Sequence, residues 1–154
     1  MSSDFTSVER WEDGEFEWEN KNCYTVPLKV FFGKVQNLFE SVQHLRAELE
    51  SKGYVPKPES MLLMEVELFK GRLLMEIPKP DQYDASVVEI EKSKVFSTVH
   101  KGEFKTIGKT AKKLQQHVES QKGVKPTATY YWDFRHGPEF SGQRTKQFVI
   151  FCRL

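Results

Sequence analysis

The sequence contains little cysteine, no long apolar run and almost no net charge. Its two cysteines, Cys23 and Cys152, stand far apart and neither belongs to a Cys-x-x-Cys pair, so we expect both to be reduced, buried and structural. The 23 basic and 22 acidic side chains leave a formal net charge of +1, which predicts no direct binding of nucleic acid or of a membrane. No apolar run approaches a bilayer span and the N-terminal stretch lacks the regions of a secretion signal, so we expect a cytoplasmic protein.

Motifs of known catalytic and cofactor sites are also missing. The four histidines show no metal-ligand spacing with one another or with the cysteines, and the chain has no GxSxG, Walker or dinucleotide fingerprint. The segment Gly108-Lys109-Thr110 lacks the earlier glycine of a phosphate loop and falls inside a predicted helix. We therefore predict no metal and no cofactor, and the sequence leaves open whether the protein is an enzyme.

An internal repeat is the most informative feature that the sequence does contain. A shift of 69 positions aligns Gly33 with Gly102, and in both copies apolar residues then recur at steps of three and four. These residues are Val35, Leu38, Val42, Leu45 and Leu49 in the first copy, and Phe104, Ile107, Ala111, Leu114 and Val118 in the second. Such spacing is typical of one helix face, so it predicts helices near residues 35–52 and 104–121.

The segments around these helices complete the predicted fold. An extended segment precedes each helix and two strand-like runs follow it, so each copy is expected to read strand, helix, strand, strand. Two such βαββ repeats predict an α+β fold with a pseudo-two-fold axis, antiparallel strands, two helices on one side and a ligand cleft between the repeats. We expect an N-terminal extension over 1–22, where Asp13-Gly14 favours a hairpin, and one domain over 23–154 made of repeats 23–80 and 86–154.

Short motifs in both copies resemble a known family. The segment VHKGEF, residues 99–104, followed by a helix and aromatic strands, resembles the GyrI-like small-molecule or effector-binding domains, which occur at the C-terminal end of AraC-type and MerR-type multidrug regulators and as stand-alone proteins. The family pattern is matched by His100, Lys101, Gly102, Glu103, Phe104, Ile107 and Leu114, and LLMEIPKP (73–80) resembles its first closing strand. Departures are Gln147, where the family often has an acid, and a last strand without proline. The resemblance covers about residues 23–154 and implies a stand-alone pocket for cationic, aromatic or amphipathic small molecules.

Alternation along the strands predicts which side chains line that cleft. Residues that point away from the two helices should form an aromatic wall and an acidic wall, and the candidate ligand-binding residues are Glu65, Glu76, Tyr130, Trp132, Phe134, Gln147 and Phe151. Aromatic faces attract cations and carboxylates add charge-assisted contacts. We expect Trp132 to be partly exposed in the empty protein. The alternatives are that the acids form the wet side of an antiparallel sheet and that Tyr130 and Trp132 are core.

Three functions remain open at this point. The sequence favours a binding protein for cationic, aromatic or amphipathic small molecules, because cleft aromatics and acids suffice for that role. One alternative, which the resemblance implies, is a hydrolase of reactive polycyclic compounds in the same cleft. The other is a protein-interaction module, as in topoisomerase modulators of the family, with an acidic partner at a basic helix face formed by Lys105, Lys109, Lys112 and Lys113. We expect a monomer or weak dimer, with His100 hydrogen-bonded at its strand-to-helix turn.

Overall fold

The computed structural model describes residues 8–57, 60–133 and 147–154, and the chain divides into two compact units. Unit 1 combines Met1–Trp18 with Ser93–Leu154, and unit 2 is Glu19–Lys92. Each unit holds one α-helix and several antiparallel strands, so the predicted α+β class is confirmed. Within the described ranges, no helix has the length and apolar character that crossing a membrane requires.

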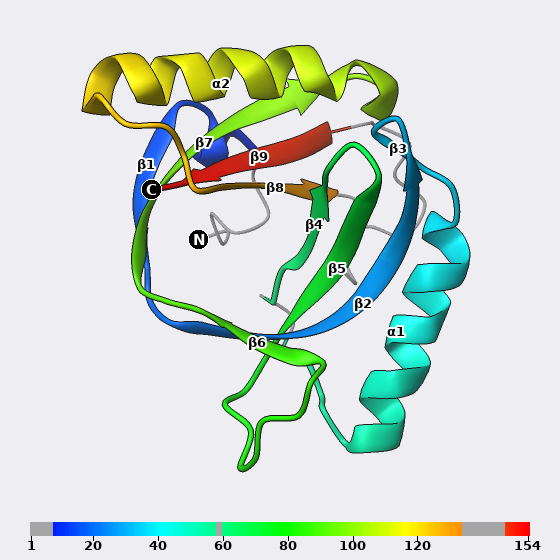
Figure 1. The fold of residues 1–154 in the computed structure, drawn as a ribbon. Coiled ribbons are helices and arrows are strands. Elements are labelled where there is room, and N and C mark those ends of the chain that lie inside the picture. Colours follow the sequence, from blue (N-terminus) through cyan, green and yellow to red (C-terminus); the bar gives the residue numbers. More distant parts are fainter. Residues whose placement is uncertain (1–7, 58–59, 134–146) are drawn as a thin grey trace. The chain divides into compact units, whose positions relative to one another are not determined.

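Unit 2 packs one helix against a small antiparallel sheet (Figure 1). Its elements are β2 (Lys21–Phe31), β3 (Lys34–Val35), α1 (Leu38–Lys52), β4 (Leu62–Val66), β5 (Lys70–Ile77) and β6 (Val87–Ile90). β5 pairs with β4 on one side and β2 on the other, and β2 also pairs with β3 and β6. The helix buries Val42, Leu45 and Leu49, the apolar positions whose spacing predicted it.

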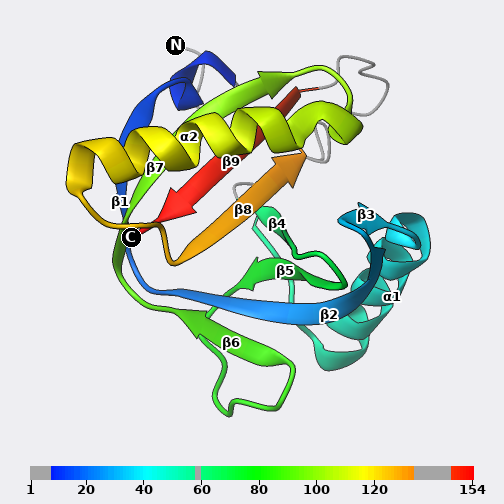
Figure 2. The ribbon, with the colours of Figure 1, turned by 45° about the horizontal axis from the view of Figure 1, so that its top comes forward.

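Unit 1 repeats this arrangement with α2 across one face of its sheet (Figure 2). Its elements are the 3-10 helix η2 (Val8–Trp11), β1 (Gly14–Trp18), β7 (Ser93–Lys101), the 3-10 helix η3 (Phe104–Thr106), α2 (Ile107–Lys122), β8 (Ala128–Asp133) and β9 (Gln147–Arg153). β9 lies between β7 and β8, and β1 pairs with the other edge of β7. The face toward α2 forms a core in which Ile107, Leu114 and Val118 pack with Phe148 and Ile150.

The predicted order of strand, helix, strand, strand is confirmed in both units. In each unit the last strand of the βαββ set lies between the other two. Both helices end at a glycine in the left-handed region, Gly53 with φ of 75° and Gly123 with φ of 73°, where glycine avoids the steric cost of a Cβ atom. The repeat in the sequence therefore corresponds to a repeat in the local structure.

Strands β1 and β6 each pair with a strand other than the one that follows them in the chain. β1 runs almost directly into β2 along the chain, yet it pairs with β7 of unit 1. β6 runs almost directly into β7, yet it pairs with β2 of unit 2. Each unit therefore receives its added edge strand from the chain segment that leads into the other unit.

Candidate functional site

The predicted aromatic residues lie together on the face of the unit 1 sheet that points away from α2. Tyr130 of β8 is paired in register with Phe151 of β9, so their side chains share one face. Phe148, Ile150 and Cys152 belong to the core under α2, and alternation therefore places Trp132 and Phe151 on the opposite side. We call Tyr130, Trp132 and Phe151 the aromatic face. The predicted orientation of these three side chains is confirmed.

Two tryptophans from the N-terminal segment cover this aromatic face. The Trp11 ring lies edge-on to Trp132 and Phe151, with centroids 5.6 and 5.5 Å away. The Trp18 ring packs on Phe151 at 5.0 Å and on Tyr130 at 6.0 Å. Trp132 is consequently only 4% exposed, so the expectation that it is partly exposed was wrong. Alternation predicted its direction, but its covering ring comes from a distant part of the chain.

Trp11 is held in place by its backbone, while its indole nitrogen is unpaired. The buried Ser97 hydroxyl donates a hydrogen bond of 2.7 Å to the Trp11 carbonyl oxygen. The Trp11 Nε1–H is buried and has no hydrogen-bond acceptor among the residues that the structure describes. An unpaired buried donor costs about 1–3 kcal/mol. The sequence analysis did not include Trp11 and Trp18 among the site residues. The available signal was the segment ERWEDGEFEWEN, where two tryptophans flank the Asp13-Gly14 turn.

The two predicted acids of unit 2 are each bound to a basic side chain. Glu76 of β5 accepts a hydrogen bond of 3.2 Å from Lys21 Nζ and one of 3.4 Å from the Met61 backbone N–H. Glu65 of β4 accepts one of 2.7 Å from Arg72 Nε, directly across the β4–β5 ladder. The predicted acidic wall is therefore a pair of ion pairs with little net charge. The Glu65–Arg72 ion pair could have been predicted from the sequence, because a β4–β5 hairpin in this register places the two residues opposite each other.

The remaining predicted residues differ in what the structure says of them. Gln147 begins β9, is half-buried and pairs in register with Lys101 of β7. Phe134 lies outside the described residues. His100 donates from Nε2 to the Glu103 carbonyl oxygen at 2.9 Å, and its Nδ1 is hydrogen-bonded with the Thr110 hydroxyl at 2.7 Å. The expected hydrogen bonding of His100 at the strand-to-helix turn is confirmed.

Both cysteines are free and buried, as expected. Burial, together with the nearby Glu76 carboxylate, raises the pKa of the Cys23 thiol to about 12. Burial also raises the pKa of the Cys152 thiol to about 11. Thiols with such pKa values stay protonated near neutral pH and are poor nucleophiles. Across the described residues, no group of three or more His, Cys, Asp and Glu side chains is placed to hold a metal ion.

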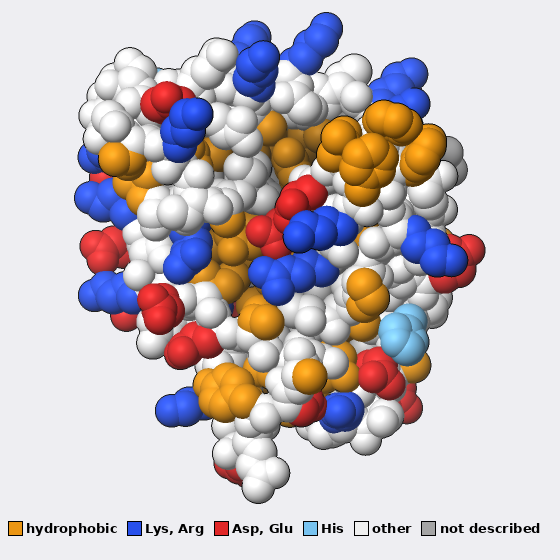
Figure 3. All heavy atoms as spheres, viewed as in Figure 1, with side chains coloured by type: hydrophobic (Ala, Val, Ile, Leu, Met, Phe, Trp, Pro, Cys, Tyr) orange, Lys and Arg blue, Asp and Glu red, His pale blue; other side chains and the backbone are white. Residues whose placement is uncertain are grey.

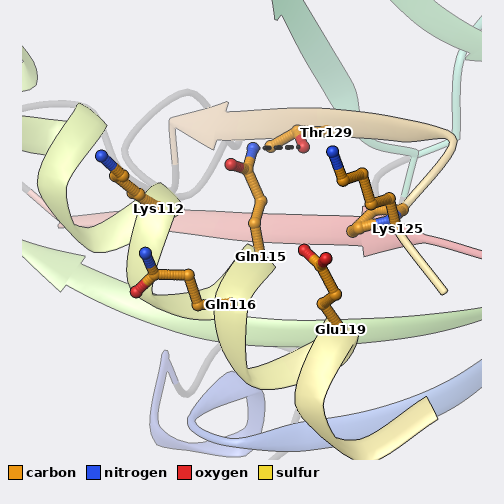
Figure 4. A pocket seen from close by; sticks show the side chains of 7 residues that line it. Lys112, Gln115, Gln116, Glu119, Lys125 and Thr129 are labelled. Carbon is orange, nitrogen blue, oxygen red and sulfur yellow. Dashed lines mark hydrogen bonds between the residues drawn. The ribbon is translucent and has the colours of Figure 1, made fainter. Parts of the chain in front are cut away.

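A separate pocket of about 400 Å³ lies on unit 1 beside the C-terminal half of α2 (Figure 4). Its lining residues are Lys112, Gln115, Gln116, Glu119, Lys125, Pro126 and Thr129. Gln115 Nε2 donates a hydrogen bond of 2.9 Å to Thr129 Oγ1 across it. Most of these side chains are exposed and polar, whereas pockets for small molecules are mostly apolar. The pocket contains none of the predicted ligand-binding residues, and the aromatic face remains the candidate site.

Comparison with known proteins shows the fold of the chain. No family model and no curated protein matches it. The crystal structure of the EcmrR C-terminal domain matches with a TM-score of 0.64 at 11% identity, over 92% of this chain and 96% of that one. A hydrolase encoded by lin2189 from Listeria innocua matches with a TM-score of 0.58 at 13% identity, over 92% and 91%.

A cryo-EM structure of an EcmrR–DNA complex matches with a TM-score of 0.70 at 10% identity, over 92% of this chain. The chain spans 56% of the length of that EcmrR chain. At these identities the likeness shows the fold alone. It agrees with the resemblance to GyrI-like domains at this coarse level: the chain has the fold seen in the EcmrR C-terminal domain.

Proposed function

We propose that this chain is a binding module for small molecules that combine an apolar or aromatic body with a cationic group. The observation that carries the proposal is the aromatic face of unit 1, covered by Trp11 with a buried indole N–H that finds no acceptor among the described residues. The fold, similar to that of the EcmrR C-terminal domain, and the VHKGEF motif support the same function.

The proposed binding step exchanges Trp11 for the ligand. The Trp11 ring occupies the position over Trp132 and Phe151 that an aromatic cation would take. The unpaired indole N–H costs about 1–3 kcal/mol while it is buried. When Trp11 moves into water this cost disappears, which offsets part of the packing free energy that is lost. A cation over the exposed Trp132 ring would then gain about 0.5–2 kcal/mol. Tyr130, Phe151 and Gln147 of unit 1 belong to the proposed set, and Phe134 stays in it as a prediction from the sequence, outside the described residues.

Cation selectivity is assigned to Glu76, with Glu65 as a second carboxylate. Each carboxylate is already paired, Glu76 with Lys21 and Glu65 with Arg72. A cationic ligand must therefore compete with a protein cation, which limits the net gain in binding energy. This part of the proposal predicts moderate selectivity for cations over neutral molecules of the same shape.

A titration with a cationic dye such as rhodamine 6G tests the exchange of Trp11. Trp11→Ala removes the competing ring, so we expect dye binding about tenfold tighter, equal to about 1.4 kcal/mol. Trp132→Phe keeps an aromatic side chain in the core but weakens the cation–π contact, so binding should weaken. Val124→Asn, at an exposed residue beyond the end of α2, serves as the control. Absence of dye binding, or equal affinities in all variants, would contradict the proposal, and consumption of the dye would favour a hydrolase.

Two substitutions at one ion pair test the role of Glu76. Glu76→Gln should weaken the cationic dye by roughly tenfold, about 1.4 kcal/mol, and leave a neutral analogue unchanged. Lys21→Met removes the competing ammonium group 3.2 Å from Glu76, so it should tighten the dye instead. Isothermal titration with both ligands measures these opposite shifts. Equal losses for the charged and the neutral ligand would indicate a packing effect and remove Glu76 from the site.

A further inference from the structure

Four apolar side chains form an exposed cluster on unit 2, which we call the Phe patch: Phe31, Phe32, Leu68 and Phe69. Each is between 56% and 61% exposed. The Phe32 ring lies 4.6 Å from Phe31 and 5.1 Å from Phe69, between ring centroids. Figure 3 shows hydrophobic side chains gathered on the surface where Figure 1 places β3 and the β4–β5 turn. An apolar cluster of this size on a protein surface is typical of an interaction site.

The cluster is built by two turns that are fixed to each other. The turn between β2 and β3 carries Phe32 and Gly33, and the turn between β4 and β5 carries Leu68 and Phe69. The Gly33 backbone N–H donates a hydrogen bond of 2.8 Å to the Leu68 carbonyl oxygen. The rings are therefore presented by a preorganised scaffold, which lowers the entropy lost on association.

The backbone at Phe32 indicates that the ring has a role beyond the fold of one chain. Phe32 has φ of 49° and Gly33 has φ of 75°, the pattern of a type I′ hairpin turn, which prefers Asn-Gly. A bulky residue in the left-handed region costs about 1–2 kcal/mol. Its ring stays 61% exposed, so little burial within the chain offsets that cost. Asparagine at position 32 would therefore give a more stable isolated chain than phenylalanine does.

We propose that the Phe patch is a homodimer contact, occupied by the same patch of a second copy. The four side chains have a surface of about 200 Å² each, and at these exposures they present together about 450 Å² of apolar surface to solvent. Because homodimer interfaces are about 65% apolar, this corresponds to about 700 Å² per copy, close to the 800 Å² of a standard interface. The proposal is independent of the small-molecule site on unit 1.

The charges around the Phe patch favour a second copy over a membrane surface. Exposed Lys29, Lys34 and Lys70 flank its two turns, and so does exposed Glu67. A two-fold contact brings each surface against itself, so it needs both signs of charge at its rim. Recognition of an anionic lipid surface usually takes a cluster of about four to eight basic residues, and Lys29, Lys34 and Lys70 beside the two turns are three.

Sedimentation velocity on the full chain tests the proposal. We expect the wild-type protein to form a dimer of two 18.0 kDa chains at about 0.1 mM, where a standard-sized interface associates. Phe32→Asn should weaken dimerisation by about 100-fold, because each dimer loses two rings, while raising the melting temperature of the monomer, because asparagine suits the turn. Phe69→Ser, in the other turn, should also dissociate the dimer. Val124→Asn, outside the patch, should leave it intact.

Three results would overturn the proposal. One is a wild-type protein that stays monomeric at about 0.1 mM, a concentration at which about 700 Å² per copy should associate. Another is a dimer that both Phe32→Asn and Phe69→Ser leave unchanged. The third is a monomer that co-sediments with phosphatidylserine-containing vesicles and loses this binding in Phe32→Asn, which would assign the patch to a membrane surface.

Discussion

At the scale of single residues, burial separates the two cysteines from reactive thiols. Both side chains are fully buried, and burial raises the pKa of Cys23 to about 12 and that of Cys152 to about 11, from an ordinary 9.0. A thiol that stays protonated reacts slowly with disulfide reagents. We expect neither residue to react with Ellman's reagent at pH 8 in the native protein, and both to react within seconds in guanidinium. Fast reaction of the native protein would contradict the burial of these thiols.

The same raised pKa values predict a loss of stability at high pH. At pH 8 and below, both thiols are almost fully protonated whether the chain is folded or unfolded, so they cause little pH dependence there. Above pH 9 the unfolded chain releases the protons and the folded chain retains them, so stability falls by up to about 1.4 kcal/mol per pH unit for each thiol. Urea unfolding at pH 8 and pH 10 measures this slope. Cys23→Ala should reduce it, and an unchanged slope would contradict the shift assigned to Cys23.

The sequence predicted the side of the sheet to which single side chains point, but it did not predict which residues contact them. Alternation placed Trp132 and Glu76 on the faces away from the helices, because the period of a strand is a local property. The cover of Trp132 by Trp11 and the pairing of Glu76 with Lys21 depend on contacts between segments far apart in the chain. No local pattern contains that information.

At the scale of elements, both helices end close to where the sequence predicted but begin about three residues later than predicted. α1 begins at Leu38 and α2 at Ile107, whereas the apolar spacing started at Val35 and Phe104. Val35 belongs to β3, and Phe104 begins a 3-10 turn before α2. Apolar spacing marks which side chains share one face of a predicted helix, and it does not mark the residue at which helical hydrogen bonding begins. The closing glycines mark a backbone conformation and were more reliable.

A pair of glycine substitutions separates a packing role from a helix-propensity role. A Cβ atom on Gly71, at the start of β5, would lie 2.7 Å from the Glu65 carbonyl oxygen and 3.1 Å from Val30 Cγ2. Gly71→Ala should therefore destabilise the protein by about 1–3 kcal/mol. A Cβ atom on Gly108 in α2 would meet no atom of another described residue within 4 Å, so Gly108→Ala should stabilise by about 0.5–1 kcal/mol. Chemical denaturation measures both. A Gly71→Ala variant as stable as the wild type would contradict the β4–β5 geometry, and a destabilised Gly108→Ala variant would contradict the open space beside Gly108.

At the scale of the whole molecule, the repeat was visible in the sequence but the exchange of edge strands was not. Two copies of one element order predict two similar units, and both were found. The partner of β1 could not be predicted from the sequence. A short strand can pair antiparallel with β2, which is next in the chain, or with β7, which is far from it in the chain. The choice of β7 places Trp11 and Trp18 over the aromatic face, so it also determines the state of the candidate site.

This topology predicts that unit 1 depends on the N-terminal segment. A chain that begins at Glu19 lacks β1 and the rings of Trp11 and Trp18, which cover Phe151 from the same side. Removing a large buried aromatic side chain costs about 3–5 kcal/mol, and two such losses approach the total stability of a domain, about 5–15 kcal/mol. We expect hydrogen exchange to show lost protection in β7, β8 and β9, and a synthetic peptide of residues 8–18 to restore it by pairing with β7. Full protection of these strands in the shortened chain would show that β1 is dispensable, and protection that the peptide fails to restore would contradict its role as a separable cover of the aromatic face.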